Sequence, residues 1–172
     1  GIKGKEVELE RLALTLGTDV PVCLYGADAI VKGIGEVIIP ASLPKVQIPT
    51  VLINPMRALS TKSVFKHFKG KFMDKGETCP SLDNLESFLD YFSDKDNSLT
   101  QAAKSLCADV KYVLTSLQTS PGCRISRLSG SGPTCFGLFT SEAKANEAAE
   151  KIASDRPDWW VVSTAILKKT AP

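Results

Sequence analysis

Long apolar runs and a strong charge of one sign are lacking in this 172-residue sequence, and histidine occurs only once. Because it has no run of about 18 apolar residues, the sequence predicts no transmembrane helix. The net charge of +2 argues against a protein dedicated to nucleic acids, which usually carries a strongly basic patch. The single histidine, His67, has no histidine, cysteine or aspartate close to it in the sequence, which indicates an ordinary surface residue. We therefore expect neither a membrane nor a nucleic acid among the partners.

The cysteines do not form a motif that binds a metal or builds a disulfide framework. There are five of them, an odd number, and no two are spaced as a CxxC pair. This usage favours a reducing compartment, where cysteines remain free thiols. Several lie in apolar runs and are predicted to be small core residues. The five are Cys23, Cys79, Cys107, Cys123 and Cys135.

What the sequence does contain is typical of an ordinary globular protein. Apolar residues make up 43% and charged residues 23%, and the length suits one domain, or one large domain with flanking pieces. The first residue is Gly1 rather than methionine, and no strand precedes the first predicted helix. We therefore expect a fragment of a longer protein, so the lack of a targeting peptide carries little information.

The first 40 residues predict one helix followed by three short strands. Apolar residues recur at helical spacing over 6–16, and Gly17 then supplies the usual C-terminal stop. The predicted strands cover 20–25, 28–32 and 36–39, with glycine turns between them.

From residue 46 the order of predicted elements is strand, helices, strand, strand, helix, strand. Strands are expected at 46–53, 123–128, 135–139 and 159–168, and helices after Thr61, at 81–92, at 99–118 and at 141–153, with a loop over 69–81. Thr61 and Ser141 are the predicted N-caps of two helices. This order is the split β-α-β pattern of a ferredoxin-like α+β fold, a four-stranded antiparallel sheet with helices on one face. The pattern predicts a fold and leaves the function open.

Two stretches have residues suited to chemistry, and each also has a purely structural interpretation. The segment SGSGPTCF at 129–136 spaces two glycines so that backbone N–H groups can turn towards phosphate oxygens, but a tight hairpin needs the same glycines. In LGTDVP at 16–21, Pro21 favours an extended Val20, so Asp19 is expected at the rim where a helix meets a strand. Asp19 is then either a turn residue bonded to its own backbone or a carboxylate held for chemistry.

Two weaker signals complete the set of candidates. Thr61 and Phe65 lie four residues apart on one short predicted helix and therefore face the same way. Phe65 is either a core residue or, if exposed, an aromatic that stacks on a ligand ring. The GIGE turn at 33–36 is interpreted as structural, because glycine pairs are common in turns. No Walker A, HExxH or GxSxG motif occurs in the sequence.

Read together and in order, LGTDVPVCLYG, GIGE, STKSVF and SGSGPTCFGLF resemble the carboxy-terminal portion of the GHMP small-molecule kinases. The resemblance spans nearly the whole chain. It implies a GHMP C-terminal domain at 41–172, preceded by a remnant of the amino-terminal, ATP-binding domain at 1–40. NSLT at 97–100 falls where the family usually has Asn-Asp-Leu-Glu, and Ser98 in place of the aspartate is a departure.

The resemblance also implies an activity and a set of roles. These kinases use ATP and Mg²⁺ to phosphorylate a hydroxyl group, and the branch most similar here acts on CDP-methylerythritol, a cytidine-diphosphate derivative, in isoprenoid biosynthesis. Asp19 matches the family's catalytic aspartate, Phe65 the aromatic that stacks on cytosine, and Thr61 a residue near the nucleotide part of the substrate. The residues that match the glycine motif beside the active site are Gly130, Ser131 and Gly132.

One family motif is missing, and alternatives remain open. The glycine- and serine-rich phosphate loop of the form PxxxGLGGGSSxAA is absent, so the chain alone is expected to be inactive and to need the missing amino-terminal portion of the same protein. The alternatives are another GHMP kinase, for homoserine, mevalonate or a sugar, and a non-catalytic ferredoxin-like binding module. The family implies the bacterial cytoplasm or, as an alternative, a plastid.

Overall fold

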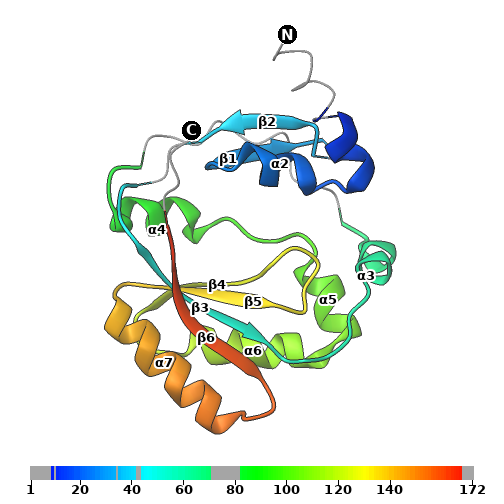
Figure 1. Ribbon diagram of the computed structural model, residues 1–172. Helices are drawn as coiled ribbons and strands as arrows, with labels where there is room; N and C mark the ends of the chain where they lie inside the picture. Colours follow the sequence, from blue (N-terminus) through cyan, green and yellow to red (C-terminus); the bar gives the residue numbers. More distant parts are fainter. Residues whose placement is uncertain (1–8, 10, 34, 42–43, 71–81, 168–172) are drawn as a thin grey trace. The chain divides into compact units, whose positions relative to one another are not determined.

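The computed structural model describes most of the chain and separates it into two compact units (Figure 1). The described residues are 9, 11–33, 35–41, 44–70 and 82–167. The first unit comprises Gly1–Lys45, Asp74–Asp83 and Lys168–Pro172, and the second comprises Val46–Met73 and Asn84–Leu167. Each unit has a β-sheet of its own.

The described residues of the first unit form two short helical segments and a two-stranded sheet. Residues 11–16 are helical, and α2 spans Val20–Tyr25. The antiparallel pair consists of β1 (Ala29–Lys32) and β2 (Val37–Pro40). The helix before Gly17 and the last two of the three predicted strands are therefore confirmed within the described residues.

The strand predicted at 20–25 is wrong, because this segment is the helix α2. Pro21 occupies the first turn of α2, where a helix needs no N–H donor, so the residue expected to favour an extended chain instead starts a helix. Gly26 ends α2 in the left-handed conformation, with a φ of 63°, and its N–H donates to the carbonyl of Val22. Asp19 therefore precedes a helix and not a strand.

The second unit is built on a four-stranded antiparallel sheet with the order β4-β5-β3-β6. Its strands are β3 (Ile48–Asn54), β4 (Cys123–Leu128), β5 (Cys135–Phe139) and β6 (Trp160–Ile166). Strand β3, the first in sequence, lies at the centre beside the last strand, which is the order of a split β-α-β fold. The predicted ferredoxin-like α+β class is confirmed. Pro49 lies near the start of β3, before pairing with β5 begins at Thr50. At this position β3 has a neighbouring strand, β6, on one side only, and such a position tolerates proline.

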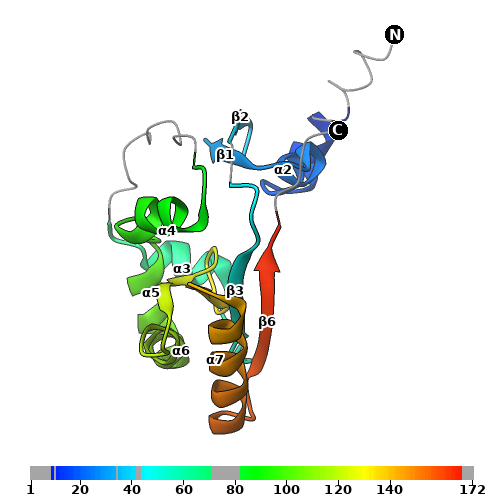
Figure 2. The ribbon, with the colours of Figure 1, turned by 90° about the vertical axis from the view of Figure 1, so that its left-hand side faces the viewer.

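Helices α6 (Ala108–Gln118) and α7 (Glu142–Asp155) pack on the same side of this sheet (Figure 2). Ser141 caps α7 as predicted, because its side chain accepts a hydrogen bond from the N–H of Lys144 at 3.3 Å. The shorter helices of this unit are α3 (Thr61–His67), α4 (Leu85–Ser93) and α5 (Thr100–Leu106). Within the described ranges, no helix has the length and apolarity needed to cross a bilayer.

Two of the helix predictions are wrong in detail. The continuous helix expected at 99–118 is interrupted at Cys107, whose extended backbone (φ −140°, ψ 100°) separates α5 from α6. The apolar periodicity continues across this break and so does not reveal it. The N-cap of α3 is Ser60 rather than Thr61, because the Ser60 hydroxyl accepts a hydrogen bond from the N–H of Ser63.

The helix predicted at 81–92 is confirmed from Leu85 onwards. Asn84 and Ser87 form a capping box before α4, in which each side chain accepts a hydrogen bond from the backbone N–H of the other residue. The loop predicted over 69–81 lies mostly outside the described residues, and so does Cys79.

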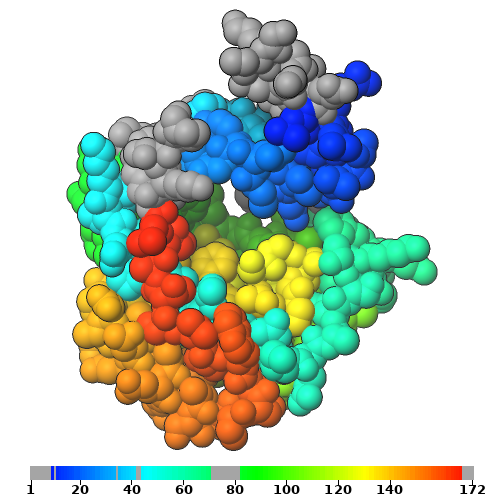
Figure 3. Space-filling model, in the orientation of Figure 1, coloured from blue at the N-terminus to red at the C-terminus, as the bar shows by residue number. Residues whose placement is uncertain are grey.

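The core of the second unit lies between the sheet and its helices. Val51 and Ile53 of β3 are fully buried in one cluster with Val113 and Leu117 of α6 and Ile152 of α7. Complete burial of one such side chain contributes about 1.5–3 kcal/mol. Strand β6 (red) and α7 (orange) lie side by side at the surface of this unit (Figure 3).

Two cysteines lie in this core, as predicted. Cys107 and Cys135 are buried, Cys123 is partly buried, and Cys23 of the first unit is exposed. Burial raises the pKa of the Cys135 thiol to about 12 and the pKa of the Cys123 thiol to about 11. Both side chains therefore stay protonated at neutral pH.

Alkylation with iodoacetamide at pH 8 is expected to distinguish these thiols. Cys23 should react readily, and Cys123 and Cys135 should react about 100-fold more slowly, because the thiolate is the nucleophile and their burial disfavours it. Timed labelling of the complete protein followed by peptide mass spectrometry measures each rate. Equal rates for Cys135 and Cys23 in the folded protein would contradict the buried position of Cys135.

Candidate functional site

The glycine segment at 129–134, called the glycine loop below, forms the turn between β4 and β5. The N–H of Ser129 donates to the carbonyl of Thr134 at 2.9 Å, and the N–H of Gly132 donates to the carbonyl of Ser129 at 2.9 Å. Gly130 and Gly132 have left-handed φ values of 55° and 80°. The hairpin interpretation is therefore confirmed. Whether the same glycines can also turn N–H groups towards phosphate oxygens depends on the groups around the loop.

Side chains from three other elements hold the glycine loop. They are Asn54 at the end of β3, Thr61 at the start of α3, and Asn97 just before α5. The hydroxyl oxygens of Thr61 and Ser131 lie 2.8 Å apart and share a hydrogen bond. The Nδ2 of Asn54 donates to the hydroxyl of Thr134 at 2.9 Å. Thr61 and the loop, both predicted from the sequence, are thus in direct contact, while the two asparagines were not among the predicted site residues.

One face of the glycine loop is packed and the other is open. A Cβ atom placed on Gly130 would meet no heavy atom within 4 Å, whereas one on Gly132 would lie 2.6 Å from Cδ1 of Leu128. Within the described part of the chain, the N–H groups of Gly130 and Ser131 donate to no other group. Two consecutive N–H groups beside open space can donate to oxygens of one anion. The loop could therefore bind an anion through these two N–H groups.

Replacing Gly132 by alanine is expected to destabilise the protein more than the same change at Gly130. A left-handed alanine costs about 1–2 kcal/mol at either position, and crowding of the buried Leu128 adds about 1–3 kcal/mol at Gly132 alone. Thermal unfolding of the two full-length variants measures the difference. Equal melting temperatures would show that the loop adapts to a side chain at Gly132.

Helix α3 presents its aromatic residue to solvent. Val64 is fully buried and anchors the helix, whereas Phe65 is 49% exposed and Thr61 is exposed one turn earlier. Of the two interpretations of Phe65, a core residue and an aromatic available for stacking, the exposure favours the second. His67 is exposed as predicted, with Nδ1 2.9 Å from the carbonyl oxygen of Ser63.

Asp19 lies in the first unit, between the helical residues 11–16 and α2. It occupies the N-cap position of α2, with φ −92° and ψ −11°, yet its exposed side chain makes no capping hydrogen bond. The interpretation of Asp19 as a turn residue bonded to its own backbone therefore lacks its hydrogen bond. Its carboxylate is free of structural bonds to the described residues.

The GIGE turn packs against the segment that carries Asp19. A Cβ atom on the buried Gly35 would lie 2.1 Å from the carbonyl oxygen of Thr18, and Gly35 has a φ of 106°. A residue other than glycine is therefore excluded here on both counts. The structural interpretation of this turn is confirmed, and the close approach helps to shape the backbone just before Asp19.

The predicted site residues fall into both units. Asp19 belongs to the first unit, and Thr61, Phe65 and the glycine loop belong to the second. Within the second unit Thr61 contacts the loop directly, and Phe65 lies one helical turn along α3. Asn54 has only a weak signal in the sequence, as the residue that directly follows a predicted strand, whereas Asn97 is the first residue of NSLT, where it matches the asparagine of the family's Asn-Asp-Leu-Glu.

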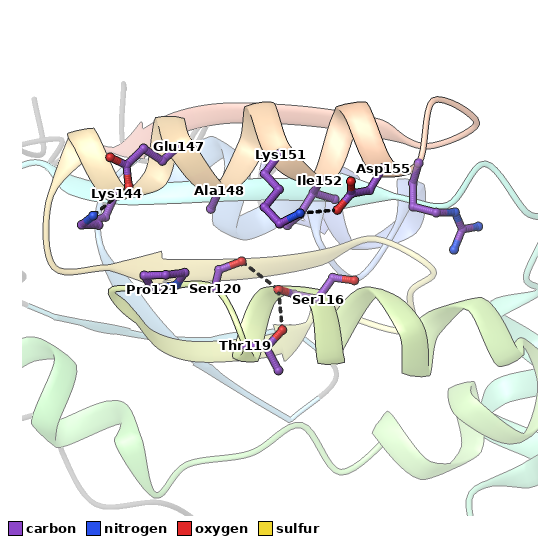
Figure 4. Close-up of a pocket in the computed structure, with 11 residues that line it drawn as sticks. Ser116, Thr119, Ser120, Pro121, Lys144, Glu147, Ala148, Lys151, Ile152 and Asp155 are labelled. Carbon is purple, nitrogen blue, oxygen red and sulfur yellow. Dashed lines mark hydrogen bonds and ion pairs between the residues drawn. The ribbon is translucent and has the colours of Figure 1, made fainter.

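A groove of about 260 Å³ between α6 and α7 is not a candidate site (Figure 4). Its lysines are paired along their own helix, Lys144 with Glu147 at 2.7 Å and Lys151 with Asp155 at 2.8 Å. The hydroxyl groups at the end of α6 donate to carbonyls of that helix. The polar groups named here are already paired, and none of the site residues predicted from the sequence lines the groove.

The described residues offer no evident place for a metal ion. Over these ranges, no three histidine, cysteine, aspartate or glutamate side chains come together as metal ligands would. No residue of this chain is therefore assigned to Mg²⁺.

Comparison with known proteins gives a consistent result. Residues 78–157 match the family described as GHMP kinases C terminal. Proteins of Cereibacter sphaeroides and Paramagnetospirillum magneticum, both named 4-diphosphocytidyl-2-C-methyl-D-erythritol kinase, are 37% and 35% identical to this chain. The alignments cover 90% and 97% of this chain, and 56% and 58% of those proteins. The chain thus spans just over half the length of these curated relatives.

Solved structures agree with the fold. A crystal structure of 4-(cytidine 5'-diphospho)-2C-methyl-D-erythritol kinase superposes with a TM-score of 0.68 at 29% identity, covering 92% of this chain and 57% of that one. A homoserine kinase from Cytophaga hutchinsonii has a TM-score of 0.53 at 16% identity, covering 88% of this chain and 51% of that one, and supports the fold alone. The chain therefore carries a domain of the family described as GHMP kinases C terminal.

Proposed function

We propose that this chain is part of an ATP-dependent kinase that phosphorylates the 2-hydroxyl of 4-diphosphocytidyl-2-C-methyl-D-erythritol, a step of isoprenoid precursor biosynthesis. The observation that carries the proposal is similarity over 90–97% of the chain to bacterial proteins of that name. A solved structure of the same name supports it, because it is similar over 92% of the chain.

In this proposal Asp19 is the base that accepts or orients the proton of the substrate hydroxyl. An ionised carboxylate within hydrogen-bond reach of that hydroxyl fits the chemistry of phosphoryl transfer, which otherwise depends on positioning and charge neutralisation. The exposed side chain of Asp19, which caps no helix, supports the role.

The second unit supplies the groups that recognise the substrate. Phe65 stacks on the cytosine ring, and its half-exposed position on α3 supports this role. Thr61 lies near the nucleotide part of the substrate, with its hydroxyl held by Ser131. The glycine loop supports the phosphate region, with the N–H groups of Gly130 and Ser131 as donors.

ATP and Mg²⁺ are the cofactors that the reaction requires. ATP supplies the transferred phosphoryl group, and Mg²⁺ neutralises charge on the phosphates. The sequence contains no PxxxGLGGGSSxAA loop, and no metal-ligand cluster occurs among the described residues. The proposal therefore assigns neither cofactor to a residue of this chain, and the partner it requires is the amino-terminal portion of the same protein.

A direct assay of the complete protein tests the proposal. With ATP, Mg²⁺ and the cytidine-diphosphate substrate, we expect one ADP per phosphorylated product and a new phosphomonoester signal in ³¹P NMR. Homoserine and mevalonate serve as parallel substrates. Phosphorylation of either one instead would overturn the substrate assignment, and binding of the cytidine ligand without transfer would favour the non-catalytic alternative.

A further inference from the structure

Asn97 holds the glycine loop through its side-chain amide, which makes three hydrogen bonds. Its Nδ2 donates both hydrogens, one to the carbonyl of Gly130 at 2.7 Å and one to the carbonyl of Leu128 at 3.0 Å. Its Oδ1 accepts a hydrogen bond from the N–H of Leu99 at 2.9 Å. Two donors and one acceptor are required at one point, and among side chains of this length only an amide supplies them.

The amide is attached to a rigid part of the core. The backbone carbonyl of Asn97 accepts from both the N–H and the hydroxyl of Thr100, at 2.9 and 2.7 Å, which fixes the residue at the start of α5. Helix α5 in turn buries Ala102 and Ala103 in the core. Asn97 therefore connects a fixed helix start to a loop that lies more than 30 residues further along the chain.

The contact with Gly130 orients one particular peptide group. The carbonyl of Gly130 and the N–H of Ser131 belong to the same planar trans peptide, so they point in opposite directions. When Asn97 binds that carbonyl, the N–H of Ser131 must point away from Asn97. This N–H has no acceptor among the described residues.

The loop's own hydrogen bonds do not fix this peptide. They involve the N–H groups of Ser129 and Gly132, on either side of it. Because Gly130 lacks a Cβ, and a Cβ placed there would meet no heavy atom within 4 Å, its backbone can rotate at low cost. Within the described part of the chain, the hydrogen bond from Asn97 is the one that acts on the peptide itself, while the bond between Thr61 and Ser131 holds only the Ser131 side chain.

We propose that Asn97 is a positioning residue of the proposed kinase, which locks the peptide between Gly130 and Ser131 so that the N–H of Ser131 faces the bound anion. The role depends on the proposed function for its chemistry, whereas the locking of the loop does not. Asn97 itself touches neither substrate nor reacting atoms in this proposal. Its effect is transmitted through the backbone of the loop.

The Asn97→Asp variant of the complete protein is the sharpest test. It keeps the shape and the acceptor for Leu99, but it removes both donors and places a carboxylate against two carbonyl oxygens. We expect the amides of Ser129 and Gly132 to exchange with deuterium about tenfold faster. We expect kcat to fall between about tenfold and 100-fold, measured well below the melting temperature, because the loop is misplaced in an otherwise folded enzyme.

Two comparisons make the test specific. Asn146→Asp is the matched control, since Asn146 lies on α7 and its Oδ1 accepts from the hydroxyl of Ser163 at 2.6 Å, a bond that aspartate can keep. This control should change neither exchange in the loop nor kcat. Asn97→Gln keeps the donors on a longer chain and should restore part of the activity lost in Asn97→Asp. If Asn97→Asp does not fold, Asn97→Gln and Asn97→Ala carry the test by the same measurements.

The outcomes separate the two proposals. Unchanged exchange of the Ser129 and Gly132 amides would overturn the locking role, and faster exchange with unchanged kcat would overturn the positioning role. A loss of activity that follows only the fraction of unfolded protein would also overturn it. If the unmodified protein does not phosphorylate the cytidine substrate, the proposed function fails, while the exchange measurements still decide whether Asn97 holds the loop.

Discussion

Asp19→Asn is expected to lower kcat of the complete protein by about 10²- to 10⁴-fold while leaving its melting temperature unchanged. Asparagine has nearly the same shape but carries no negative charge, so it cannot accept or orient the proton of the substrate hydroxyl. The structure indicates that this substitution changes the charge without disturbing the fold. The side chain of Asp19 is exposed and caps no helix, so its replacement removes no structural hydrogen bond.

The loss is expected in kcat rather than in the KM for either substrate, because a base acts on the transition state and contributes little to ground-state binding. Asp155→Asn is a suitable control. Asp155 is an exposed carboxylate on α7 that pairs with Lys151 at 2.8 Å, and exposed pairs of this kind contribute about 0–1 kcal/mol. Steady-state kinetics of both variants measure the effect. A fall in kcat of less than about tenfold for Asp19→Asn would show that Asp19 is not the base.

The sheet of the second unit could be predicted from the sequence because its strands carry strong local signals. The apolar segments that became β3, β4, β5 and β6 each have a glycine, proline or asparagine near at least one end, and the order of elements fits one common fold. The start of α7 was equally clear, since Ser141 caps the helix directly. In each case local preference and tertiary packing favour the same structure.

The errors occur where two local preferences compete. Pro21 disfavours a helical conformation for the residue before it, but it also suits the first turn of a helix, and in α2 the second effect prevails. Ser60 and Thr61 are both good N-caps, so only the hydrogen bond to Ser63 identifies the residue that is used. At Cys107 the apolar pattern is continuous although the helix is not.

The sequence predicted several residues of the candidate site but not the hydrogen bonds that join them. Thr61 and Ser131 were both identified from the sequence, but their hydrogen bond joins residues 70 positions apart and depends on the sheet that places α3 beside the loop. Asn54 resembles an ordinary residue at the end of a strand, and Asn97 matches a family motif whose contacts the sequence does not give. Their role as donors to the loop appears only when the loop backbone is in place.

Phe65→Ala is expected to raise the KM for the cytidine-diphosphate substrate by about 5- to 150-fold, with little change in the KM for ATP. Stacking of an aromatic side chain on a base contributes about 1–3 kcal/mol, and each 1.4 kcal/mol corresponds to about a tenfold change in affinity. Phe65 is 49% exposed and its buried neighbour Val64 anchors α3, so the substitution should leave the fold intact. Steady-state kinetics and calorimetric titration with CDP measure the effect.

Tyr112→Ala supplies the matched control for this change. Tyr112 is an aromatic residue of similar exposure, 57%, and it lies on α6, a different helix from α3. Its removal should alter neither KM, so any effect specific to Phe65→Ala reports on stacking rather than on loss of a surface aromatic. If Phe65→Ala left the KM unchanged, cytosine would not stack on α3. A GHMP kinase acting on homoserine, mevalonate or a sugar would then explain the chain better, because such substrates have no aromatic base on which Phe65 could stack.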